Sequence, residues 1–312
     1  MSSETTETMD SRLVELLRCP QDGGRLLLQP GNGHESGAFA GRLLCAACGS
    51  EIPMAAGILR FLTAERNNLC ALQKSEMQVR DRDYRAAAAE FCRGRVPGLG
   101  AFDVPEFDAV RRALGDCRGR SVLDAGCGAG KLTPAVRNAE SYLGVDLSWE
   151  GLMNFQKPSR ALTALAQADV TRLPVASGAF DVALGCQIVS HLPTPELRSR
   201  FVAEMARALK PSGRLILTAM HYSFRYRNRQ RPREGVEGGS YFHRFEVAEL
   251  RALLSERFSI LSLRGYWIYL PKTYRLFVAL GTWKKYSDRM LRALPLSLTY
   301  GKYLLAVCAP KP

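Results

Sequence analysis

The stretch SVLDAGCGAGK, from Ser121 to Lys131, decides the fold of this chain. Its apolar run predicts a buried strand, and Gly126, Gly128 and Gly130 then predict a tight turn into a helix. Glycines there let the backbone bend sharply and approach a ligand closely, while the start of a helix offers free N–H groups. A second apolar run, YLGVDL, ends in Asp146, placed to accept hydrogen bonds from ribose hydroxyls. The alternative is a set of turn glycines with a capping aspartate.

Short apolar strands and helical patterns alternate after this stretch. Such alternation predicts a parallel sheet covered by helices, an α/β doubly wound core. The helix from Pro195 to Lys210 carries apolar residues at a spacing of four, and the PSG that follows ends it. The other predicted strands are SVLDAGC, SYLGVDL, ALTALAQADV, FDVALGC, GRLILTAM, FSILSLRG (Phe258–Gly265) and YGKYLLAVCAP (Tyr300–Pro310), and the other helices are KLTPAVRNA and WEGLMNFQK.

Taken in order, these motifs resemble those of class I S-adenosylmethionine-dependent methyltransferases. VLDAGCGAG resembles that family's first motif, GVDLS its second, QADVTRLPVASGAFDVALGCQIVSHL its third and fourth, and ALKPSGRLILT its fifth strand with the preceding turn. The resemblance covers roughly Arg120 to Thr218. It implies a seven-stranded Rossmann-like sheet with helices on both faces, S-adenosyl-L-methionine as cofactor and methyl transfer as the activity. Dinucleotide-dependent dehydrogenases share the fold, but their loop reads G-x-G-x-x-G and they lack a counterpart of ADVTRLPVASGAFD.

The resemblance also implies where the cofactor lies. Asp124 and the glycine loop would hold the methionine part, and Asp146 would hold the ribose. Asp169, with the Val170 backbone, would meet the adenine amine and ring. The residues implied to bind the cofactor are Asp124, Gly126, Gly128, Gly130, Asp146, Leu147, Asp169, Val170, Cys186 and Gln187.

Three histidines are candidates for a general base. Methyl transfer from a sulfonium is an in-line displacement, so a base is needed only if the acceptor must lose a proton. His221, His243 and His191 all follow or lie near strand ends at the crevice edge, and they are preferred in that order. For His191 the alternative is a residue that packs or caps the next helix. For His221 it is a loop histidine in solvent.

Two basic segments stand out in a chain whose net charge is +13. Residues 266–299 interrupt the last two strands with an aromatic, basic insertion, and five arginines lie between Arg225 and Arg233. The insertion reads either as a helical lid with a solvated basic face or as an interfacial membrane element. Both interpretations favour a large, greasy or anionic acceptor. The arginine run suits RNA, an anionic headgroup or a solvated loop.

The N-terminal module resembles the small zinc-ribbon-like (Trm112-like) domains found alone as methyltransferase partners or fused ahead of methyltransferases. Those domains read Cys-Pro-x-Cys and then Cys-x-x-Cys, whereas here Asp22 replaces the second cysteine. A Cys3Asp zinc site remains possible, with His34 as an alternative fourth ligand, and so does a ribbon held by packing alone. The candidate ligands are Cys19, Asp22, Cys45 and Cys48.

These observations divide the chain into a disordered tail (1–11), the ribbon (12–64), a helical linker or cap (65–105) and the methyltransferase domain (106–312). The leading hypothesis is methylation at O or C of a small-molecule or lipid-like biosynthetic intermediate. An RNA methyltransferase and a non-catalytic cofactor-binding adaptor are the alternatives. Nine cysteines without a dense framework, and a start without a signal peptide, predict a cytoplasmic protein. The basic insertion also suggests peripheral contact of the protein with the inner face of an anionic membrane.

Overall fold

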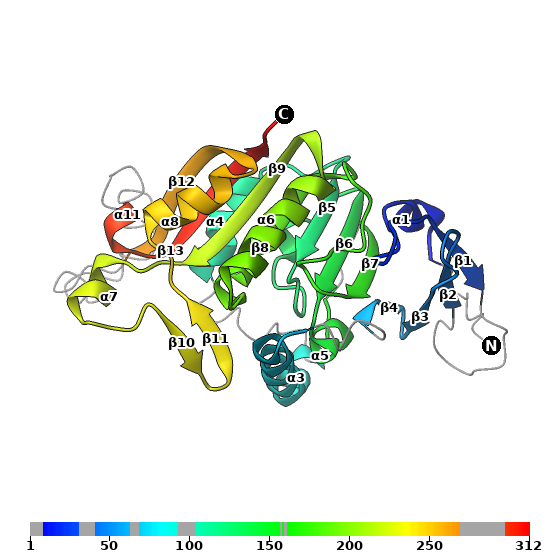
Figure 1. The fold of residues 1–312 in the computed structure, drawn as a ribbon, viewed down its shortest axis with the longest axis horizontal. Helices are drawn as coiled ribbons and strands as arrows, with labels where there is room; N and C mark the ends of the chain where they lie inside the picture. The colour runs from blue at the N-terminus through cyan, green and yellow to red at the C-terminus, as the bar shows by residue number, and fades with distance from the viewer. Residues whose placement is uncertain are drawn as a thin grey trace.

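A large mixed sheet organises the described part of the chain. The computed structural model describes residues 9–30, 41–62, 69–92, 104–156, 158, 161–268 and 297–312. Within these residues eleven strands form one sheet in the order β1-β2-β3-β4-β7-β6-β5-β8-β9-β13-β12 (Figure 1). The last seven strands in this order are the predicted seven-stranded Rossmann-like sheet, so the predicted α/β fold class is confirmed.

The strands of the seven-stranded part follow the predicted apolar runs. The five strands from β5 to β9 are parallel to their neighbours, and β13 pairs antiparallel with both β9 and β12. Their bounds are β5 Ser121–Ala125, β6 Ser141–Asp146, β7 Leu162–Gln167, β8 Phe180–Cys186, β9 Leu209–Met220, β12 Phe258–Ile268 and β13 Gly301–Pro310.

Helices cover both faces of this part because alternate residues of each strand point to opposite sides. Leu123 of β5 packs in one core with Phe201 of α6 and Leu250 of α8, whereas Val122 packs in another with Val110 of α4. Figure 1 shows α6 and α8 in front of the strands and α4 behind them. The helices are α4 Val104–Leu114, α5 Trp149–Met153, α6 Pro195–Ala208, α7 Phe224–Asn228, α8 Val247–Ser255 and α11 Ser297–Tyr300.

The prediction of a helix directly after the glycine loop is wrong. KLTPAVRNA forms only a 3-10 turn, η2, at Thr133–Ala135. Pro134 lies in this turn and has no N–H to donate, and the chain must return to β6 at Ser141 within a few residues. The helix over WEGLMNFQK is likewise reduced to α5, and α6 ends at Ala208 rather than Lys210.

The N-terminal ribbon is part of the same sheet rather than a separate body. After the short helix α1 (Ser11–Glu15), β1 Leu26–Pro30, β2 Gly41–Cys45, β3 Glu51–Ala55 and β4 Ile58–Arg60 form an antiparallel series. β4 then pairs in parallel with β7, where Leu59 lies opposite Ala166. The ribbon therefore extends the seven-stranded part of the sheet at the edge formed by β7.

A long helix, α3, connects the ribbon to the rest of the chain. It spans Ala71–Cys92, inside the predicted helical linker. Figure 1 shows it at one end of the strands, between α5 and the hairpin of β10 (Glu234–Glu237) and β11 (Ser240–His243).

Most of the predicted lid lies outside the described residues, which stop at Ile268 and resume at Ser297. Its role therefore stays a prediction. No helix within the described residues is long and apolar enough to cross a membrane.

Because β4 and β7 share backbone hydrogen bonds and an apolar core, the ribbon and the seven-stranded part of the sheet should unfold together. We expect Leu59→Ala, at a fully buried position, to lower the free energy of unfolding by about 2 to 5 kcal/mol. Leu27→Ala, at a half-exposed position of β1, serves as the control and should have little effect. Denaturant unfolding followed by far-UV circular dichroism checks this. Two separate transitions in the wild-type protein would contradict it.

Candidate active site

A cavity of about 410 Å³ lies at the carboxyl ends of the parallel strands. In open α/β sheets ligands bind in the crevice at this edge. The ends of strands β5 to β9, the loops after them and Tyr303 of β13 line one side, and α3 lines the other. Of the residues implied to bind the cofactor, the cavity is lined by Asp124, Gly126, Asp146, Leu147, Val170, Cys186 and Gln187.

The glycine loop is held to the second strand by Asp146. One carboxylate oxygen of Asp146 accepts the N–H of Gly128 at 2.8 Å, and the other accepts the N–H of Ser148 at 2.8 Å. Burial raises the pKa of Asp146, and these two hydrogen bonds oppose that rise. Asp146 thus stands at the cavity wall with its carboxyl group fixed in place.

Glycine is favoured at position 128 by its backbone conformation and by the approach of Tyr84. Its φ is +51°, and a Cβ there would lie 2.1 Å from the hydroxyl oxygen of Tyr84 on α3. The helix α3 therefore approaches the glycine loop closely. Glycine permits such an approach because it has no Cβ. Gly130 does not line the cavity, although its φ of +84° shapes the same turn.

Asp124 is buried beneath the loop at the end of β5. Its carboxyl group accepts the hydroxyl of Tyr142 at 2.7 Å. Burial, the largest cause, raises the pKa of Asp124 to about 7. Near neutral pH this group is therefore balanced between its charged and neutral forms, and a nearby cation would favour the charged one.

The predicted adenine position is contacted by α3. Val170 lines the cavity, and Asp169 accepts hydrogen bonds from the backbone N–H of Thr171 and, at 3.3 Å, from the side chain of Gln73. Gln73 belongs to α3 and is itself buried. The helix thus supplies a wall at this end of the cavity.

Sequence reasoning missed a buried carboxylate, Glu106 on α4. Its Oε2 is 2.5 Å from the Lys131 ammonium, and its Oε1 accepts from Gln187, Thr218 and Tyr266. Burial raises the pKa of Glu106, but Lys131 and these donors outweigh burial, so the pKa lies below its ordinary value. The acidic first turn of α4 was visible in the sequence. Its partners lie 25 to 160 residues away, which no local pattern reveals.

Of the three candidate histidines, His191 lines the cavity. Its Nδ1 lies 2.7 Å from the carbonyl oxygen of Tyr241, and burial lowers its pKa. His221 is fully buried outside the cavity lining, with Nδ1 2.8 Å from the carbonyl of Gly301.

His243 lies away from this cavity, in the wall of a second hollow. It is buried between two carboxylates: Nδ1 is 3.0 Å from Glu234 and Nε2 is 2.8 Å from Glu249. Both ring nitrogens of His243 are therefore engaged, whereas the hydrogen bonds of His191 to other described residues are at Nδ1.

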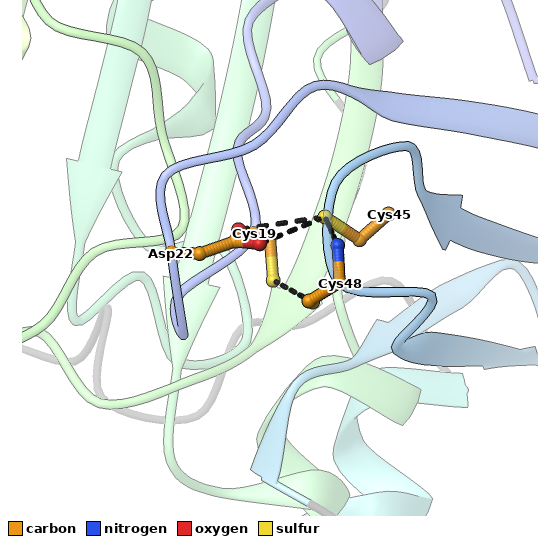
Figure 2. Close-up of side chains that lie close together, drawn as sticks. All are labelled: Cys19, Asp22, Cys45 and Cys48. Carbon is orange, nitrogen blue, oxygen red and sulfur yellow. Dashed lines mark hydrogen bonds between the residues drawn. The ribbon is translucent and has the colours of Figure 1, made fainter.

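The structure brings the four predicted metal ligands together. The ligand atoms of Cys19, Asp22, Cys45 and Cys48 all lie within 4.8 Å of one another (Figure 2). The sulfur atoms of Cys19 and Cys48 are 3.7 Å apart, and that of Cys45 is 3.4 Å from an oxygen of Asp22. A tetrahedral zinc with Zn–S bonds of about 2.3 Å places its sulfur atoms about 3.8 Å apart. These residues fit a zinc ion. The alternative ligand His34 lies outside the described residues.

Comparison with known proteins agrees with this geometry. Residues 123–217 match the family model described as a methyltransferase domain. Over 98 residues the chain is 36% identical to a candidate methyltransferase of Encephalitozoon cuniculi. This match covers 31% of this chain and 43% of that protein. Over 127 residues it is 29% identical to the ubiquinone biosynthesis O-methyltransferase of Alkalilimnicola ehrlichii. That match covers 37% of this chain and 47% of the other protein. The chain thus spans less than half the length of these relatives.

Among solved structures, the chain is similar in fold to the 1,6-didemethyltoxoflavin-N1-methyltransferase of Burkholderia thailandensis. The TM-score is 0.50 at 19% identity, and the match covers 89% of this chain and 99% of that one. Residues 123–217 therefore match a methyltransferase domain, and the fold of the chain is similar to that of a solved methyltransferase.

Proposed function

We propose that this protein transfers a methyl group from S-adenosyl-L-methionine to O or C of a small-molecule or lipid-like intermediate. The observation that carries this proposal is the single cavity that joins the implied cofactor residues to His191. Asp146 and Val170 line one part of it, and His191 and Met220 line another. A cofactor and an acceptor can therefore meet inside one site from which α3 helps to exclude water.

The order of the strands divides this cavity. Val170 follows β7, Asp146 ends β6 and Gly126 follows β5, whereas Met220 ends β9 and Tyr303 lies on β13. Neighbouring strands lie about 4.8 Å apart, so these positions span roughly 24 Å across the sheet. The half over β7, β6 and β5 suits the adenosine and methionine parts of the cofactor. The half over β8, β9 and β13, which we call the acceptor half, suits the methyl acceptor.

His191 is our proposed general base. The carbonyl of Tyr241 can only accept a hydrogen bond, so the Nδ1 of His191 carries the hydrogen and Nε2 carries the lone pair. Burial lowers the pKa of His191, which keeps the imidazole neutral at pH 7 and able to take a proton. When bound, the cofactor would supply a methyl group on a positively charged sulfur, and His191 would accept the proton that the acceptor loses.

RNA methylation is the second candidate, and one surface favours it. Arg227, Arg229, Arg231 and Arg233 are exposed on and after α7. Arg244 lies over the ring of Tyr226 beside them, 4.5 Å from its centre. Exposed arginines near aromatic rings can bind phosphates and stack on bases. Contact of the basic insertion with an anionic membrane stays a further hypothesis. A role as a non-catalytic adaptor is another.

Transfer of a labelled methyl group tests these alternatives. We expect incubation with methyl-labelled cofactor and fractionated cell extract to place label in a small-molecule or lipid fraction, insensitive to ribonuclease. His191→Ala should slow this transfer about 100-fold, because a positioned base contributes that much or more. Its affinity for S-adenosylhomocysteine should remain unchanged and serves as the folding control. Label that enters RNA and is lost after ribonuclease treatment would establish the RNA alternative instead.

We also propose that the ribbon binds one zinc ion through Cys19, Asp22, Cys45 and Cys48. Burial raises the pKa of Cys19 to about 12, so this thiol ionises only if a cation stabilises the thiolate. Zinc would supply that stabilisation and join the loop before β1 to the turn after β2. This is a structural role, distant from methyl transfer.

Metal analysis of protein purified without chelator checks this proposal. We expect about one zinc ion per chain in the wild type and in Asp22→Cys, because both provide four ligands of suitable chemistry. Cys48→Ser, which removes a thiolate, should retain much less. A zinc content near zero in the wild-type protein would contradict the site and leave a ribbon held by packing.

A further inference from the structure

Resting on the proposed function, we propose that Glu76 of α3 is a positioning residue that prepares His191 to accept the proton of a neutral hydroxyl group. This names both a residue outside the matched methyltransferase domain and a class of acceptor. The residue lies in the linker that joins the ribbon to the domain, 115 positions before His191 in the sequence.

Glu76 is fixed beside the imidazole by contacts at both carboxylate oxygens. Its Oε1 lies 3.6 Å from the Nδ1 of His191 and accepts the Nε–H of Arg80 at 2.8 Å. Its Oε2 accepts the hydroxyl of Ser240 at 2.6 Å. The side chain of Glu76 is buried and lines the same cavity as His191. It is therefore held in one orientation, on the side of the ring opposite to the proton-accepting nitrogen.

The surroundings of His191 come from two elements. Glu76 and Arg80 are the charged side chains of α3 that act on it, and β11 provides the carbonyl of Tyr241 and, at 3.4 Å, the hydroxyl of Ser240. Burial is the largest influence and lowers the pKa of His191. Arg80 lowers it further and Glu76 raises it. Without Glu76, a buried imidazole next to an arginine would be a poor base.

The carboxylate matters most when the proton moves. As the acceptor oxygen forms its bond to the methyl carbon, the bond from that carbon to sulfur breaks and the hydroxyl proton passes to Nε2 of His191. The imidazole then carries a positive charge in a buried site, and the negative charge of Glu76 compensates it. His191 can return this proton to water after the products leave.

This arrangement indicates a class of acceptor. A carboxylate is already ionised at neutral pH and needs no base to become a nucleophile. A phenol or alcohol keeps its proton at neutral pH, and a base supported by a buried carboxylate addresses that need. The Glu76 and His191 pair therefore fits O-methylation of a hydroxyl better than methylation of a carboxylate.

The competing explanation is that Glu76 only attaches α3 to the β10–β11 hairpin through Ser240. A titration separates the two. The chain has four histidines, so the imidazole signal that disappears in His191→Asn identifies His191 in nuclear magnetic resonance spectra. We expect the pKa of His191 to be lower in Glu76→Gln than in the wild type. Asp83→Asn, which makes the same carboxylate-to-amide change at an exposed position of α3, should leave it unchanged.

Kinetics with a phenol or alcohol acceptor complete the test. Glu76→Gln should reduce kcat about tenfold and move the acid limb of the pH profile to lower pH, with the affinity for S-adenosylhomocysteine unchanged. Glu76→Asp, which keeps the charge, should recover part of kcat. An unchanged pKa of His191, or a loss of kcat without movement of the pH profile, would overturn the inference. Failure of the wild-type protein to bind S-adenosylhomocysteine would overturn the proposed function and with it this role of Glu76.

Discussion

The site depends on the two hydrogen bonds that Asp146 accepts at the edge of the sheet. One fixes the N–H of Gly128 and the other that of Ser148, so a single carboxylate joins the loop after β5 to the loop after β6. This edge is where parallel strands place their carboxyl ends together. The position of the glycine loop in turn sets how closely α3 can approach, because the hydroxyl of Tyr84 occupies the space that a side chain at Gly128 would need.

The helix α3 covers the crevice and lines the candidate site with its side chains. It reaches Asp169 at one end through Gln73, the glycine loop through Tyr84, and His191 at the acceptor half through Glu76. Asp81 of the same helix accepts the hydroxyl of Ser148 at the start of α5. The linker is therefore as much a part of the site as the matched domain, and the ribbon that precedes it adds its strands to the same sheet.

The sequence predicted the features that depend on local patterns. Apolar runs predicted the strands, and the loop from Gly126 to Gly130 and Asp146 were predicted at the crevice from their order along the chain. The helix predicted after the loop does not form, because Pro134 and the short return to β6 outweigh the helical composition. The pairing of β4 with β7, and the places of Glu76 and Glu106 in the cavity, depend on contacts between residues far apart in the chain. Periodicity and motifs carry no information about such contacts.

Binding of S-adenosylhomocysteine, measured by titration calorimetry, tests the central claim most directly. The account predicts one site per chain and an affinity about 10- to 100-fold weaker in Asp146→Asn, because hydrogen bonds to a charged group contribute about 1.5 to 3 kcal/mol. Asp116→Asn, at an exposed aspartate outside the cavity, should bind as the wild type does. Absence of binding to the wild type, or equal affinities for the wild type and Asp146→Asn, would contradict the account.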